Sequence, residues 1–381
     1  MSDNEKEKNV SNIMKYIEKN KLETIFSDIV KKKFKDVKSS IGAIDIGYGN
    51  TKYVSGCDEE GDIVFGAFPS LTPLASQRIS GNLFISRDTR VVDVNGTLYE
   101  IGTDTEDLVS GTNSDVTKVL DESYIMSEPY KALFYGALSY MGKTHYDYLV
   151  MGLPVSFMHN DHKIVEMFKG KHEITKDFTC TVDNIIVVPQ PLGGFYEVAI
   201  QKGIYEDMLD SYNLVIDPGY LTFDILVTKG LSPIETRSGA INGGMSKILN
   251  SLAKSISQTT GKSFDDLAAI DKAIRKPRLF KDKEGKETRK RVVKIGTTFI
   301  ELDEHIKKTS SVIDSSITAM NNIVRTYDDI DNIILVGGAE NIFAKKIEKN
   351  LEGREIHKSE QSLYSNVTGF FLIGILQSLV K

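Results

Sequence analysis

"AIDIGYGNTKYV" (residues 43–54) joins an apolar run to a glycine-rich turn, with one acidic residue at the junction. The apolar run predicts a buried strand that carries Asp45 to its end, and Gly47 and Gly49 let the chain turn tightly. The turn is followed by an amide, a hydroxyl and an ammonium, on Asn50, Thr51 and Lys52. Such a turn suits a polyphosphate, and a carboxylate at the strand end suits hydrated Mg²⁺. Taken alone, the motif also fits an ordinary hairpin.

A second stretch, "VIDPGYLTFDILV" (residues 215–227), repeats this pattern. Asp217 again ends an apolar run, 172 positions after Asp45, and Asp224 follows seven positions later. The turn between them contains Gly219 and Thr222. Two strand–turn–strand hairpins in matching contexts predict duplicated halves that face each other. Such a pair would grip the phosphates of a nucleotide from both sides.

Length and composition favour a two-domain globular protein. A chain of 381 residues exceeds one typical domain, so two domains sharing a cleft are expected. The net charge of -6 argues against nucleic-acid binding over the whole surface, although a local basic patch stays open. Cys57 and Cys180 have no metal-like spacing, which predicts two thiols in a cytoplasmic chain.

Neither end of the sequence predicts membrane insertion. The first twelve residues are polar, so no signal peptide is expected. The apolar stretch "GFFLIGILQSLV" (residues 369–380) is shorter than the ~20 residues that span a bilayer, and we expect a buried helix there.

The predicted secondary structure changes along the chain. Residues 1–40 contain no glycine or proline and predict a helical extension, either packed on the body or acting as an arm for a partner or a membrane surface. From residue 41, strands alternate with helices, which indicates α/β layers around mainly parallel or mixed sheets. "RKPRLFKDKEGKETRKR" (residues 275–291) is a basic insert expected to form a hairpin or loop. It is either solvated or in contact with DNA, an adaptor or a neighbouring subunit.

Other catalytic patterns find little support. His159 and His162 lie three positions apart without an evident third ligand, so surface histidines are favoured over a zinc site. The chain has neither a Gly-x-x-x-x-Gly-Lys-[Ser/Thr] loop nor a Gly-x-Ser-x-Gly elbow.

Five motifs together resemble the fingerprints of the actin superfamily, in that family's order. Asp-x-Gly-x-Gly-x-x-Lys at 45–52 and Asp-x-Gly-x-x-Thr-x-Asp at 217–224 resemble its two phosphate loops. "VPQPLGGFYEVAI" (188–200) and "SNVTGFFLIGIL" (365–376) resemble its connecting segments. "IILVGGAENIF" (333–343) resembles its adenosine motif.

Within the superfamily, "AIDIGYGNTKYV", "FPSL", "IDPGYLTFD" and "NVTGFF" most resemble plasmid-segregation actins of the ParM/StbA type and the actin-like component of bacterial PRTRC gene clusters. Tyr220 and Leu221 stand where chaperone-type members keep glycines, so the second loop departs from that pattern. We expect Tyr48 and Tyr220 to be packing residues. Residues 1–40 and the basic insert lie outside the shared core.

The resemblance implies an actin-like α/β fold, ribonuclease H-like and duplicated, with a nucleotide cleft between two domains. Domain I would span residues 41–212 and be completed by 366–381, and domain II would span 213–365. The implied function is binding and hydrolysis of ATP with Mg²⁺, coupled to polymerisation into filaments. Those filaments would segregate plasmid or other DNA through a DNA-binding adaptor protein.

The resemblance also assigns roles to residues. Asp45 and Asp217 would orient the Mg²⁺ shell, and Gln190 would position the attacking water. The phosphates would be held by Gly47, Gly49, Asn50, Thr51, Lys52, Gly219 and Thr222. The nucleoside would approach Gly337 and Gly338, and a helix starting at Gly243 and Gly244 would lie near the ribose and phosphates.

Two other functions stay open. A small-molecule kinase on the same fold would need an acceptor pocket and a carboxylate base, for which the sequence offers no clear candidate near Gln190. A non-polymerising nucleotide-dependent scaffold would use residues 1–40 to recruit a partner. The preference for ATP over GTP and the filament architecture do not follow from the sequence.

Overall fold

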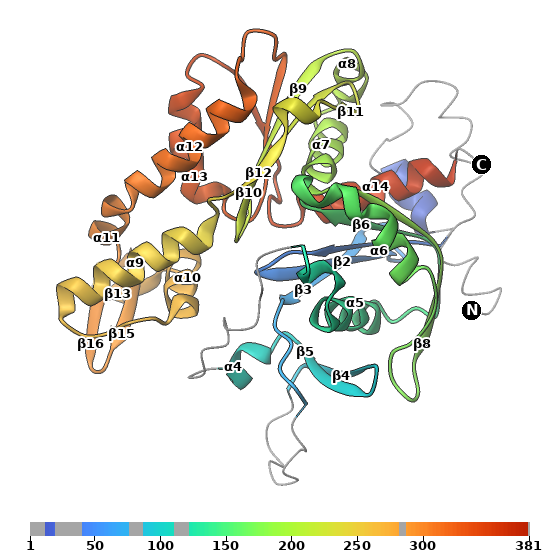
Figure 1. Ribbon diagram of the computed structural model, residues 1–381, viewed down its shortest axis with the longest axis horizontal. Helices are drawn as coiled ribbons and strands as arrows, with labels where there is room; N and C mark the ends of the chain where they lie inside the picture. Colours follow the sequence, from blue (N-terminus) through green and yellow to red (C-terminus); the bar gives the residue numbers. More distant parts are fainter. Residues whose placement is uncertain (1–11, 20–39, 76–86, 110–121, 282–286, 380–381) are drawn as a thin grey trace.

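The computed structural model describes residues 12–19, 40–75, 87–109, 122–281 and 287–379. Two halves, each built on one mixed sheet, make up the body (Figure 1). The first sheet has the order β3-β2-β1-β6-β8-β7, and the second has the order β11-β10-β9-β17-β18, with β12 paired to β10.

The central strands of the two sheets share one topology. In the first, β2 is antiparallel to β1, whereas β6 is parallel to β1 and β8 is parallel to β6. In the second, β10 is antiparallel to β9, whereas β17 is parallel to β9 and β18 is parallel to β17. The strands of the first sheet are β1 (Ile41–Ile46), β2 (Asn50–Cys57), β3 (Ile63–Pro69), β6 (His145–Leu153), β7 (Gly170–Glu173) and β8 (Thr179–Pro189). Those of the second are β9 (Tyr212–Pro218), β10 (Thr222–Lys229), β11 (Ser232–Pro233), β12 (Gly239–Asn242), β17 (Asn332–Leu335) and β18 (Ile356–Lys358). The expected duplicated actin-like architecture is therefore confirmed.

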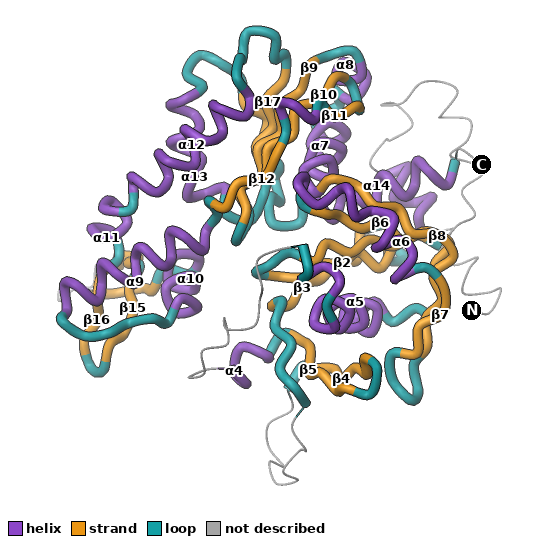
Figure 2. Tube along the Cα trace, viewed as in Figure 1, coloured by secondary structure: helices purple, strands orange, loops and turns teal. Residues whose placement is uncertain are grey.

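Helices cover both faces of each sheet (Figure 2). Those of the first half are α4 (Thr105–Val109), α5 (Glu128–Met141), α6 (Asp161–Phe168), α7 (Gln190–Gln201) and α8 (Tyr205–Leu209). Those of the second are α9 (Met245–Thr260), α10 (Leu267–Arg275), α11 (Asp303–Lys308), α12 (Ser310–Val324), α13 (Glu340–Asn350) and α14 (Ser365–Ser378). Short 3-10 helices are η2 (Tyr124–Met126), η3 (Val155–Asn160) and η4 (Glu235–Arg237).

Two helices, α7 and α14, lie between the sheets, and each packs on the sheet of the other half. The helix α7 follows β8 of the first sheet but packs against β9 and β10 of the second. Conversely, α14 follows the second sheet but packs against β1 and β6 of the first, and the two helices contact each other. The apolar run near residue 370 thus forms a buried helix, as expected. The domain boundaries given above stay a prediction.

The core explains why the central strands are apolar on both faces. In β1, Ala43 faces the core shared with α7 and α14, whereas Ile44 faces α5. In β9, Val215 faces the shared core, and Ile216 faces α9 and α13. Since side chains alternate along a strand, burial on both faces requires a continuous apolar run. Such runs precede both aspartates of the repeated motif.

Residues 12–19 of the N-terminal extension form a helix that packs on the body. Ile13, Tyr16 and Ile17 are buried in the shared core, where the Tyr16 ring lies edge-on to that of Phe371. The Asn12 side-chain amide donates to the Cys57 carbonyl at 3.0 Å. Of the two alternatives for this region, packing on the body holds for these eight residues, and the rest of the extension lies outside the described residues.

The basic insert contains a hairpin, one of the two expected forms. Its strands β13 (Arg278–Lys281) and β14 (Glu287–Lys290) pair antiparallel, and residues 282–286 lie outside the described part. Two further hairpins are formed by β15 (Val292–Ile295) with β16 (Thr298–Glu301) and by β4 (Thr89–Val94) with β5 (Thr97–Gly102). Within the described ranges, no helix combines the length and apolarity needed to cross a membrane.

Candidate functional site

The two repeated motifs form turns with the same internal hydrogen bond. The Gly47 amide donates to the Asn50 carbonyl at 3.1 Å, and the Gly219 amide donates to the Thr222 carbonyl at 2.9 Å. A Cβ at Gly47 would lie 3.0 Å from the Asn50 oxygen, which leaves little room for a side chain. Strand register places Asp45 opposite Lys52 and, equivalently, Asp217 opposite Asp224. The sequence repeat is therefore also a structural repeat.

In the first half, Asp45 is held by a cation and an amide. The Lys52 ammonium lies 2.8 Å from Asp45 Oδ2, and the Gln190 side-chain amide donates to Asp45 Oδ1 at 2.8 Å. Asp45 is only 1% exposed, so both partners satisfy a carboxylate that water hardly reaches. Gln190 is the first residue of α7, which places its side chain at the end of β8 beside Asp45.

In the second half, two buried carboxylates face each other across β9 and β10. Asp217 accepts from the Asn366 amide at 2.6 Å, and Asp224 accepts from the Val155 backbone at 3.1 Å and the Thr222 hydroxyl at 2.5 Å. Burial, with repulsion from Asp45, raises the pKa of Asp217 to about 6. Burial, with repulsion from Asp217, raises the pKa of Asp224 to about 7. The second loop therefore carries an acidic pair where the first carries an ion pair.

These groups line one cavity between the two halves, of about 200 Å³. Of the predicted site residues, it is lined by Asp45, Gly47, Gly49, Asn50, Lys52, Gln190, Asp217, Gly219, Thr222, Gly337 and Gly338. A second cavity of about 570 Å³ adjoins it and shares Gly337, Gly338, Asn341, Ser362 and Leu363. The two together have the volume of a small-molecule site, ~300–1,000 Å³.

Three predicted residues are not among the described residues that line the cavity. The Thr51 side chain is buried, with its hydroxyl 2.9 Å from that of Ser70. The Gly244 amide donates to the Leu221 carbonyl at 2.9 Å, and Gly243 lies against Ser316. The Thr51 and Gly244 contacts hold residues of the two loops in place, and the predicted ligand contacts of these three residues stay a prediction.

Gly337 allows the chain just after β17 to pass close to Asp217. Its φ of +95° is unfavourable for residues with a side chain, and a Cβ there would lie 2.2 Å from Asp217 Oδ1. Only glycine therefore fits at this position without moving the carboxylate.

The two tyrosines of the repeat both pack and line the cavity. Tyr48 stacks on Tyr124 with ring centroids 5.2 Å apart. The Tyr220 ring lies against Gly49, where a Cβ would be 3.0 Å from the ring, so the two loops touch here. Both side chains belong to hydrophobic clusters, as expected, and both also line the cavity.

Sequence reasoning missed several lining residues, including Asn366 and the ion-paired Asp271 and Arg275 of α10. Asn366 falls inside the recognised segment 365–376, but its hydrogen bond to Asp217 spans 149 positions and leaves no local signal. Asp271 and Arg275 show a spacing of four, which indicates only a helical ion pair.

The donor set fits a hard divalent cation. Asp45, Asp217 and Asp224 all line the cavity, and the pKa values of Asp217 and Asp224 are raised by burial and by the neighbouring carboxylates. Lys52 neutralises one of these carboxylates. Oxygen-only ligands with excess negative charge are what Mg²⁺ prefers.

Comparison with known proteins identifies the family. A model of the N-terminal domain of actin-like proteins matches residues 43–193, and a model of the C-terminal domain of archaeal MreB-like actin homologues matches residues 215–349. The chain thus belongs to the actin superfamily and has its two-domain α/β fold. No curated protein matches the sequence significantly.

Solved structures with this fold include ParM-like proteins. ParM from Clostridium botulinum, in a 15-stranded filament, is 19% identical with a TM-score of 0.66, covering 88% of this chain and 98% of its own. The archaeal actin homolog Ta0583, in complex with ADP, is 18% identical with a TM-score of 0.62 and the same coverage. The actin-like protein Alp7A is 16% identical with a TM-score of 0.65, covering 90% and 97%. At these identities the likeness establishes the fold.

Proposed function

We propose that the protein binds ATP with Mg²⁺ in the cavity between its halves and hydrolyses it, coupled to assembly into filaments. The observation that carries this proposal is the paired turn: two equivalent loops, from the two sheets, present Asp45 with Lys52 and Asp217 with Asp224 to one cavity. The ADP-bound archaeal homolog of the same fold supports a nucleotide as the ligand.

The chemistry follows from the side chains present. Lys52 and the turn amides would bind the phosphates, and Asp45, Asp217 and Asp224 would hold the hydrated Mg²⁺, which neutralises phosphate charge when bound. The Gln190 amide, oriented by its hydrogen bond to Asp45, would position the attacking water. An amide does not take up a proton at neutral pH, so this role is orientation rather than general base catalysis.

Filament assembly is the proposed output. A nucleotide that contacts both loops favours the closed arrangement of the halves, and the assembly surface needs to exist only in that state. Head-to-tail contacts that do not close on themselves give filaments, such as those of the botulinum ParM relative. By resemblance to the ParM type, the proposed task is segregation of plasmid or other DNA through an adaptor protein.

Phosphate release and light scattering, measured together, test both parts. With Mg-ATP but not Mg-ADP or buffer, we expect scattering to rise and phosphate to be released without any added acceptor. Gln190→Ala should keep nucleotide binding while turnover falls by about 10²-fold, the loss expected when a reacting group is misplaced by about 1 Å. Gln201→Ala, at the exposed far end of the same helix, is the matched control and should turn over normally.

Each outcome separates a rival. Turnover without a rise in scattering would favour the nucleotide-dependent scaffold. Turnover that requires an acceptor would favour the kinase. If Gln190→Ala hydrolysed ATP at the wild-type rate, the assignment of Gln190 would be wrong.

A further inference from the structure

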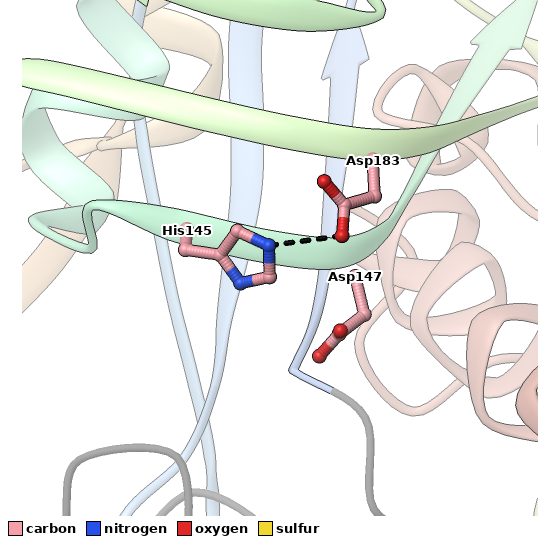
Figure 3. A group of neighbouring side chains, drawn as sticks. All are labelled: His145, Asp147 and Asp183. Atoms are coloured by element: carbon pink, nitrogen blue, oxygen red, sulfur yellow. Dashed lines mark hydrogen bonds and ion pairs between the residues drawn. The ribbon is translucent and has the colours of Figure 1, made fainter. Parts of the chain in front are cut away.

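Three potential metal ligands lie close together at the end of the first sheet that is opposite to the nucleotide cavity (Figure 3). His145 and Asp147 are two positions apart on β6, so their side chains lie on one face of the sheet. The register pairs Tyr146 with Val182 and Tyr148 with Asn184, which places Asp183 of β8 beside Asp147 on that same face. None of the three belongs to the recognised motifs.

The geometry brings one ligand atom from each residue close together. His145 Nε2 lies 3.0 Å from Asp183 Oδ2, and the three ligand atoms all lie within 4.8 Å of one another. This group is at the start of β6, whereas Pro154, directly after the end of β6, lines the nucleotide cavity. It is therefore separate from the Asp45 site, with the length of the strand between them.

The local electrostatics favour a cation. Like charges directly opposite on neighbouring strands are destabilising, and Asp147 and Asp183 occupy such positions. The Ser40 backbone amide donates to Asp147 Oδ2 at 2.6 Å, which orients that carboxylate. Solvent reaches the group, because the side chains of His145 and Asp183 are 22% and 50% exposed. An ion can therefore enter without opening the fold.

We propose that His145, Asp147 and Asp183 form a Zn²⁺ site. An imidazole with two carboxylates suits zinc better than Mg²⁺ or Ca²⁺, which prefer oxygen alone. Tetrahedral zinc with bonds of ~2.0–2.2 Å holds its ligand atoms ~3.4 Å apart, so the His145–Asp183 separation needs to widen slightly and the others need to shorten by at most ~1.5 Å. Three protein ligands leave a fourth position for water.

Zinc titration of the full-length, nucleotide-free protein against a chromogenic chelator tests the site. We expect one Zn²⁺ per chain with micromolar affinity, and visible absorption bands of tetrahedral Co²⁺ on substitution. Asp183→Asn and His145→Ala should each weaken Zn²⁺ binding by at least ~100-fold, beyond the usual cost of losing an outer-shell partner. Omitting nucleotide keeps ATP from competing for the metal.

Glu122→Gln is the matched control. Glu122 forms a similarly close pair with His159, 2.9 Å apart, and its side chain is about as exposed as that of Asp183, at 55% against 50%. This pair belongs to no group of three ligands in the described part of the chain. This variant should bind Zn²⁺ like the wild type. The proposal is overturned if wild type binds no stoichiometric Zn²⁺, which leaves His145 and Asp183 as an ion pair only. It is also overturned if folded Asp183→Asn, checked by its circular dichroism, binds as tightly as wild type.

Discussion

Asp224→Asn should stabilise the nucleotide-free protein at alkaline pH and not at acid pH. Burial raises the pKa of Asp224 from 3.8 to about 7, so its ionisation opposes folding. The sign follows from linkage. The part of the folding stability that depends on Asp224 is fully present below pH ~4, where the carboxyl is protonated in both states, and is lost as the pH rises through ~7. The shift corresponds to an upper limit of about 4 kcal/mol. Asn keeps the shape, its oxygen can accept from Val155 and its amide can donate to Thr222, so we expect about 2 kcal/mol to be recovered.

Thermal melting in EDTA at pH 5 and pH 8 measures this effect. Two kcal/mol corresponds to a rise in melting temperature of roughly 4–8 °C for a domain of this size, at pH 8 and much less at pH 5. Asp177→Asn, at an exposed aspartate between β7 and β8, should change neither value. An equal shift at both pH values, or destabilisation at pH 8, would refute the electrostatic explanation. With Mg-ATP the wild type should have the higher melting temperature, because the variant lacks a carboxylate that we assign to Mg²⁺.

Three further changes probe other contacts. Gly337→Ala should weaken nucleotide binding at least ~10-fold in calorimetry, because its methyl group would meet Asp217. Gly353→Ala is the control, because Gly353 also has a positive φ but no atom lies near a Cβ there, and this variant should bind nucleotide normally. Lys52→Gln should lower the melting temperature by an amount equivalent to ~3 kcal/mol, because it leaves the buried Asp45 without its cation; no change would mean that Gln190 alone suffices. Ile17→Asp should lower the free energy of unfolding by roughly 3 kcal/mol, because it buries a charge in the shared core. Lys19→Ala, which breaks an exposed ion pair, should lower it by under ~1 kcal/mol. Equal effects would argue against docking of residues 12–19.

Local patterns predict much of this structure, and long-range register accounts for what they miss. The strands before Asp45 and Asp217 are readable because burial on both faces demands continuous apolar residues, and the turns are readable because glycine is needed there. Thr51 is a residue whose contacts the motif does not predict, because its hydroxyl lies against that of Ser70, which is outside the motif. The group around His145 is equally hidden, because it depends on how β8 aligns with β6.

The arrangement of α7 and α14 suggests how the two loops are coupled. Each helix begins beside the aspartate of its own half, through Gln190 on Asp45 and Asn366 on Asp217. Each then packs on the sheet of the other half, and Asn366 also accepts from the Gly194 amide of α7 at 3.1 Å. If a bound cation shifted either carboxylate, we would therefore expect the movement to reach a helix that packs on the opposite sheet. Because the two helices share one core, we expect the proposed nucleotide binding at both loops to bias the relative orientation of the halves.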